Sequence, residues 1–120
     1  MGFFEVVRVL LGGVPKDSDG RYLPKDIKQL KKLVKNNKVD LGDINTSLIT
    51  DMSSLFAEST RDNFSGIETW DVSNVTDMSS MFSDAESFNQ PLENWKVSNL
   101  VDTSGVLVES GMDEKICLVG

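Results

Sequence analysis

The residues best suited by type and spacing to do chemistry are three aspartates that recur along the chain. Asp51, Asp77 and Asp102 lie 26 and then 25 residues apart. If these positions stack, their carboxylates form a ladder that could hold calcium. The EF-hand and glycine-rich calcium motifs are absent, however, and an aspartate before a helical turn commonly accepts hydrogen bonds from backbone N–H groups. We therefore expect the aspartates to cap helical turns, and we expect no metal site and no cofactor.

A series of serines, Ser47, Ser73 and Ser98, recurs at a similar spacing. The chain has no histidine, so a serine nucleophile would lack the base that usually activates it. Paired-carboxylate and glycine-rich phosphate motifs are also missing. Cys117 is the single cysteine, which excludes an internal disulfide and zinc sites of the Cys and His type. The sequence therefore predicts that the chain is not an enzyme and has no catalytic residues.

The formal charge of -7 is unevenly distributed. Residues 1–40 hold nine Lys and Arg against five acids, whereas residues 41–120 hold three against fourteen. Nucleic-acid binding needs a clustered basic surface, so we expect no nucleic-acid partner. An acidic body is compatible with a basic protein partner, and it is equally typical of turn residues that keep a protein soluble.

Self-similarity organises the middle of the chain. Three segments align without gaps, beginning at Leu41, Ile67 and Leu92. The apolar positions of the second copy are Ile67, Trp70, Val72, Val75, Met78, Met81 and Phe82. Almost all of them are apolar in the other two copies as well. The pattern indicates a repeat of 25 to 26 residues whose copies must stack, because one copy cannot bury its own apolar edge.

Each copy predicts the same local elements. In the second copy, Trp70 and Val72 alternate as on a short strand that ends at the turn Ser73 and Asn74. The residues Met78, Met81 and Phe82 then follow at the spacing of one or two helical turns. Trp70 and Trp95 occupy the inward position of the strand, so we expect them in the core rather than in a binding site. The predicted fold class is an α/β repeat.

The stretch WDVSNVTDMSSMFSDAESFNQPLENWKVSNL resembles the BspA-like family of bacterial surface protein repeats. These repeats of 25 to 26 residues occur in bacterial lipoproteins and were once described only as a domain of unknown function. The resemblance implies a short leucine-rich-repeat-like solenoid, with one short strand and one short helix per coil. It also implies a protein-binding role without catalytic residues and a location at the cell surface or outside the cell.

The flanking segments divide the chain into three parts: residues 1–40, the repeat at 41–107, and a cap or tail at 108–120. Within the first part, residues 24–38 predict an amphipathic helix that caps the first coil. Residues 1–13 are compatible with a strand, a short helix or an oligomer contact. Their apolar run is interrupted by Glu5 and Arg8 and is too short to span a membrane. We expect neither a signal peptide nor membrane insertion, which leaves a cytoplasmic location open.

The leading functional hypothesis is a module that binds a protein of unknown identity. The outward residues of the strand segments would carry the binding: Asn45, Ser47, Asp71, Ser73, Lys96 and Ser98. The alternative is a small acidic inhibitor or decoy, intracellular or phage-encoded, that binds a basic protein surface. A homodimer that covers the open apolar edge of the last copy is a further hypothesis.

Overall fold

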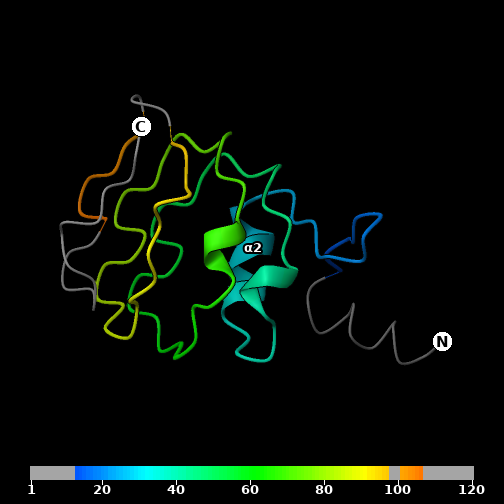
Figure 1. Cartoon of the computed structure of the whole chain (residues 1–120), viewed down its shortest axis with the longest axis horizontal. Coiled ribbons are helices and arrows are strands. Elements are labelled where there is room, and N and C mark those ends of the chain that lie inside the picture. The colour runs from blue at the N-terminus through cyan, green and yellow to red at the C-terminus, as the bar shows by residue number, and fades with distance from the viewer. Residues whose placement is uncertain (1–12, 98–100, 107–120) are drawn as a thin grey trace.

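The computed structural model describes residues 13–97 and 101–106 (Figure 1). Within these ranges the regular elements are the α-helix α2 (Ile27–Val34) and two 3-10 helices, η1 (Leu41–Asp43) and η2 (Ile67–Thr69). The predictions for residues 1–12 and 108–120, including Cys117, lie outside the described part of the chain, and so does Ser98.

Helix α2 confirms the helix that the sequence predicts within residues 24–38. It starts after Asp26, whose carboxylate accepts a hydrogen bond from the backbone N–H of Gln29 at 2.9 Å, while the Gln29 side chain accepts one from the Lys25 N–H at 2.9 Å. This reciprocal pair satisfies two N–H groups that a helix start leaves open. The buried residues of α2 are Leu30, Leu33 and Val34. Its apolar face therefore packs on the core of the molecule, as the lysine-rich opposite face requires.

Arg61 ties the end of α2 to the loop after the first copy. It is only 5% exposed, and its guanidinium donates hydrogen bonds to the carbonyl oxygens of Val34 at 3.0 Å and Asn36 at 3.1 Å. Further bonds reach the carbonyl oxygens of Val39 and Asn63. Burial lowers the pKa of Arg61, and the charge of Asp40 opposes that shift. A buried cation here donates to the Val34 carbonyl, which the end of the helix leaves without a backbone donor.

The structure differs from the predicted strands. Where the second copy was expected to extend through Trp70 and Val72, the chain first forms η2 and then passes through extended residues without making a strand. Gly66 enters η2 with a φ of +100°, and the Trp70 N–H donates back to the Ile67 carbonyl at 3.0 Å. The backbone bends locally at this point, so the described part of the chain contains only isolated β-bridges.

The predicted helical turns are also absent from the described residues. The segment around Met78 and Phe82 is a series of overlapping turns, with the Met81 N–H bonded to the Met78 carbonyl and the Ser83 N–H to the Ser80 carbonyl. Ser80 has a φ of +55°, which no right-handed helix can contain. Its equivalents in the other copies have φ values of +55° at Ser54 and +66° at Gly105. The third copy thus places glycine where this backbone conformation is least costly.

Backbone hydrogen bonds join the same segment of successive copies. Parallel bridges pair Asp51 with Asp77 and Asp77 with Asp102. In the residues that follow each bridge along the chain, every second N–H of one copy donates to a carbonyl of the next copy. From the first copy to the second, the donors are Met52, Ser54, Phe56 and Glu58, and the acceptors are Asp77, Ser79, Met81 and Ser83. Met78, Ser80 and Phe82 repeat the arrangement with Asp102, Ser104 and Val106. We call residues 51–58 and their equivalents the arm of each copy.

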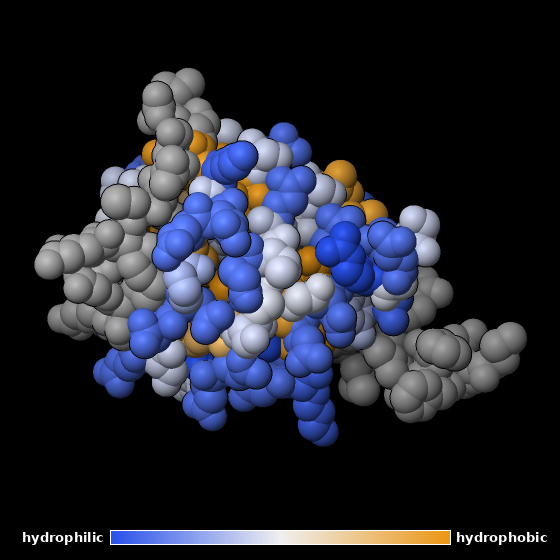
Figure 2. All heavy atoms as spheres, in the orientation of Figure 1, coloured by the Kyte–Doolittle hydropathy of each residue, from blue (hydrophilic) through white to orange (hydrophobic). Residues whose placement is uncertain are grey.

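The core contains the recurring apolar positions of the first two copies and those at the start of the third, including both tryptophans at 4% and 1% exposure. Equivalent phenylalanines stack from copy to copy, with the rings of Phe56 and Phe82 at 5.5 Å and 4°. Phe88 stacks on Phe82 at 3.8 Å. Such pairs add to the stabilisation that burial of the rings gives. The face seen in Figure 2 is mainly hydrophilic, with apolar atoms in small patches.

Candidate functional site

The predicted binding residues occupy two equivalent positions of each copy, around the turn that precedes the arm. Asp71, Ser73 and Lys96 are exposed, whereas Asn45 and Ser47 are half-buried. The turns of the first two copies are joined by the Asn74 side chain, which donates to the Ser47 carbonyl at 2.8 Å. The structure therefore brings residues from two copies together at one edge, which we call the turn edge.

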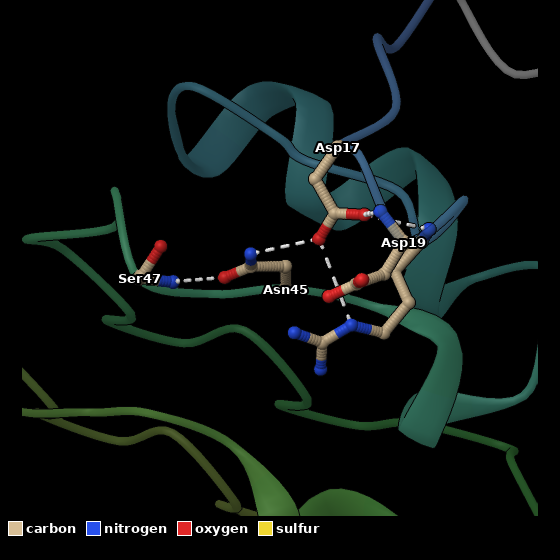
Figure 3. A network of polar contacts seen from close by, with 5 residues as sticks. Asp17, Asp19, Asn45 and Ser47 are labelled. Atoms are coloured by element: carbon tan, nitrogen blue, oxygen red, sulfur yellow. Dashed lines mark hydrogen bonds and ion pairs between the residues drawn. The ribbon is translucent and has the colours of Figure 1, made fainter.

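Asn45 is occupied by contacts within the chain (Figure 3). Its amide group donates to the Asp17 carboxylate at 2.9 Å, and its side-chain oxygen accepts from the Ser47 N–H at 3.0 Å. The other oxygen of Asp17 accepts from the N–H groups of Asp19 and Arg21, both at 2.9 Å. The hydrogen bond from Asn45 is the main reason that the pKa of Asp17 is lowered. Asn45 thus fastens the segment before α2 to the first copy.

Asp71 retains one carboxylate oxygen for solvent or a partner. Its Oδ1 accepts from the Ser73 backbone N–H at 3.0 Å and from the Ser73 hydroxyl at 2.6 Å. These bonds, the hydroxyl first, lower the pKa of Asp71. Within the described residues its Oδ2 makes no hydrogen bond. Asp71 therefore presents a fixed negative charge on the turn edge at neutral pH.

Leu48 is the residue of this edge that the sequence reasoning missed. It follows Ser47 in the turn of the first copy and is 50% exposed. The equivalent residue of the second copy is Asn74, whose side chain bonds to the first copy. That difference between aligned positions was the signal that could have singled out Leu48: an apolar residue stands where the next copy has a polar one.

The aspartates of the arms form turns instead of capping helices, so the predicted helix caps are wrong. Oδ1 of Asp77 accepts from the Ser79 N–H at 2.9 Å and the Ser79 hydroxyl at 2.7 Å, and Asp102 bonds Ser104 in the same way. Asp51 accepts from the Ser53 N–H at 2.8 Å. The physical reason is that aspartate offers the backbone a local hydrogen bond that competes with a helix. Among the described residues, no three acidic or thiol side chains come together in a way that could hold a metal ion.

A hollow of about 210 Å³ lies between the end of α2 and the arm of the first copy. Val34, Lys35 and Asn37 line one side, and residues 55–61 line the other. It mixes apolar and polar groups and lies away from the predicted binding residues.

In the described part of the chain, no helix is both long and apolar enough to cross a membrane.

A family model described as "Mycoplasma protein of unknown function, DUF285" matches residues 25–113. The chain belongs to this family. The DUF285 match begins just before α2 and runs through all three copies of the repeat. No curated protein and no solved structure matches the chain. Membership in DUF285 confirms the broader part of the family assignment made from the repeats, and the description of the family assigns no function.

Proposed function

We propose that this DUF285 chain is a non-catalytic protein-binding module, built as a short leucine-rich-repeat-like solenoid that α2 caps. The finer family assignment belongs to the same proposal: the repeats are of the BspA-like bacterial surface type, and the partner is a host or surface protein. The observation that carries the proposal is the turn edge, where exposed residues of two copies are held in register by the bond from Asn74 to Ser47.

The turn edge has the chemistry of a small protein interface. Leu48 of the first copy offers an apolar side chain and Asp71 of the second a fixed carboxylate, and Lys96 adds an exposed ammonium group at the equivalent position of the third copy. Interfaces commonly combine an apolar contact with a surrounding polar rim that selects the partner. Of the predicted residues, Ser73 belongs to this set, whereas Asn45 supports the edge from below through its bond to Asp17.

The test is quantitative capture of proteins from a host-cell surface extract, followed by binding measurements with each purified candidate. The first variant is Leu48→Asn, which installs the residue that the second copy carries at that position. The second is Asp71→Lys with Lys96→Glu. The control is Glu86→Lys, an exposed site outside the turn edge.

We expect a partner that binds the wild type and the control equally and binds each edge variant at least about tenfold more weakly, which corresponds to about 1.4 kcal/mol. A purified partner that is insensitive to all edge variants would place binding elsewhere. No binding of any purified candidate would reject the proposal.

The acidic inhibitor or decoy remains a second proposal because the arms place Asp51, Asp77 and Asp102 side by side. A partner held mainly by this row of charges would lose affinity steeply with salt, since the Debye length falls from about 10 Å at 0.1 M to about 3 Å at 1 M. Binding through the turn edge would change much less. Repeating the affinity measurement at both salt concentrations separates the two proposals.

A further inference from the structure

Lysines gather on one face of α2. This lysine face, as we call it, consists of Lys28, Lys31, Lys32 and Lys35. The four positions lie within an arc of about 100° around the helix axis, because successive residues of an α-helix are turned by about 100°. Three of the lysines are exposed and one is half-buried. Among the described residues the single ion pair joins Arg21 and Asp17 at 3.6 Å, so no lysine of the face is paired with a carboxylate there.

The lysine face is more basic than a capping helix requires. Like charges three or four residues apart destabilise a helix, and Lys28 and Lys35 each lie at that distance from both Lys31 and Lys32. A cap needs only a polar outer side, which lysines alternating with glutamates would provide without this repulsion. An anionic surface docked on the face would relieve the repulsion. The arrangement therefore favours a negatively charged partner.

A complementary surface lies on the repeats of the same chain. Parallel bridges hold Asp51, Asp77 and Asp102 side by side, at about the 4.8 Å that separates paired backbone segments. We call these residues the aspartate row. Each of them uses Oδ1 for its own turn, and Oδ2 makes no hydrogen bond within the described residues. Neighbouring lysines on a helix face stand about 5–6 Å apart, so the two rows of charges have nearly the same spacing.

The charges of the described residues are divided in the same way. Residues 13–40 hold eight Lys and Arg against four acids, whereas the described residues of 41–106 hold two against eleven. Because the lysine face is not paired with an acid of its own repeats within the described residues, its complement is available on a neighbouring molecule. A lipid surface shares the negative charge of the aspartate row, but its phosphates have no fixed spacing. Charge and spacing together favour a second copy.

We propose that the lysine face of one molecule binds the aspartate row of a second copy of this chain. Lys28, Lys32 and Lys35 pair with the three carboxylates, one lysine to each copy of the repeat. Because the face and the row are different surfaces, two such contacts close a dimer or continue into a longer assembly. The contact does not depend on the binding role proposed for the turn edge.

Sedimentation equilibrium of the full chain tests the contact. The protein concentration should extend to about 1 mM, because exposed ion pairs are individually weak. The measurement is made in about 0.1 M and about 1 M salt, where the Debye length is about 10 Å and about 3 Å. We expect the average mass to rise with concentration at the lower salt and the association to weaken at least about tenfold at the higher salt. A monomer at every concentration would overturn the proposal.

Two triple variants identify the surfaces. The face variant changes Lys28, Lys32 and Lys35 to glutamine. The row variant changes the three aspartates to asparagine, which keeps the oxygen that accepts the hydrogen bonds of the turn. Each variant alone should associate at least about tenfold more weakly than the wild type. An equimolar mixture of the two should associate again, because the first retains the row and the second retains the face.

A matched control separates the row from net charge. Asp62→Asn with Glu86→Gln and Glu93→Gln removes three negative charges from exposed positions outside the row, and it should associate like the wild type. Equal weakening in this control and in the row variant would refute the aspartate row. The face variant alters only lysines at the helix surface, so unchanged association of this variant would refute the lysine face even if the row variant failed to fold. Binding to phosphatidylserine vesicles by a chain that stays monomeric would make a lipid surface the occupant and reject the second copy.

Discussion

The indole Nε1 of Trp70 donates a hydrogen bond to the backbone carbonyl oxygen of Leu41 at 2.7 Å. One copy later, Trp95 makes the equivalent bond to the carbonyl oxygen of Ile67 at 3.0 Å. In each case the tryptophan reaches the first residue of the preceding copy, which is the start of a 3-10 helix. The first copy carries Ile44, which has no side-chain donor, at this position.

Replacing Trp70 by phenylalanine should lower the free energy of unfolding. The Leu41 carbonyl would keep the Ile44 N–H at 3.2 Å but lose the indole donor, which costs about 0.5–1.5 kcal/mol, and the smaller ring would add a packing loss. Urea denaturation measures the effect. Tyr22→Phe is the control, because the Tyr22 hydroxyl has no hydrogen-bond partner among the described residues, and we expect it to change stability by less than about 0.5 kcal/mol. Equal stabilities for the two variants would contradict the role assigned to the indole.

Gly66→Ala should be strongly destabilising and Gly42→Ala nearly neutral, although the two glycines face each other. A Cβ on Gly66 would lie 2.5 Å from the Gly42 nitrogen, and the φ of Gly66 is +100°. A Cβ on Gly42 meets its nearest atom, the Gly66 Cα, at 3.7 Å, an ordinary contact. We expect a loss of at least about 2 kcal/mol for the first variant. Thermal unfolding of both proteins tests the difference, and a reversed order would refute the close approach of η1 and η2.

Arg61→Met should loosen the end of α2. The variant keeps much of the apolar stem but removes the guanidinium that donates to the carbonyl groups of Val34 and Val39, at a cost of about 2–4 kcal/mol. Hydrogen exchange should speed up first at residues 33–39. Lys96→Met removes a charge from an exposed position and serves as the control. Unchanged exchange in α2 would mean that the guanidinium does not hold the helix end.

Asn45→Ala should raise the pKa of Asp17, because the Asn45 amide is the main cause of its lowered value. A carboxyl group whose pKa is lowered by folding stabilises the protein above its unfolded pKa of about 3.9. That stabilisation is lost as the pH falls through the lower folded value. The stability difference between wild type and variant should therefore be largest at neutral pH and shrink below about pH 4.

Carboxyl ¹³C titration of Asp17 and urea denaturation at pH 7 and at pH 2.5 measure both effects. Ser18→Ala, at an exposed neighbouring position, is the control. A stability difference that stayed constant between the two pH values would show that the Asn45 bond does not act through the Asp17 charge.

The sequence predicted the features that depend on repetition and hydrophobic period. The spacing of Asp51, Asp77 and Asp102 gave the register in which the arms pair, and the burial of Trp70 and Trp95 confirmed the core assignment. These inferences succeed because burial of apolar surface dominates folding and leaves a periodic trace in the sequence.

The local backbone could not be predicted in the same way. The positions of Met78, Met81 and Phe82 suit a helix, yet the arm is a chain of turns because Asp77 bonds Ser79 and Ser80 takes a positive φ. A spacing of three and four residues between apolar positions fits a helix and a chain of turns equally well, so it does not distinguish these two conformations. Arg61 was missed for another reason. Its acceptors are backbone carbonyls of a distant segment, and because every residue has a backbone carbonyl, the residue types there do not reveal the contact.

The shared direction of the hydrogen bonds between arms bears on how such a protein can change length. The N–H groups of Met52, Ser54 and Phe56 bond the second copy as the equivalent groups of Met78, Ser80 and Phe82 bond the third. After an in-frame duplication of the middle copy, the added copy could form the same backbone hydrogen bonds with the copies before and after it. After a deletion, the first and third copies could form these hydrogen bonds with each other. The polypeptide can therefore grow or shrink in steps of 25 or 26 residues, with mutation free to diversify the exposed turns of each new unit.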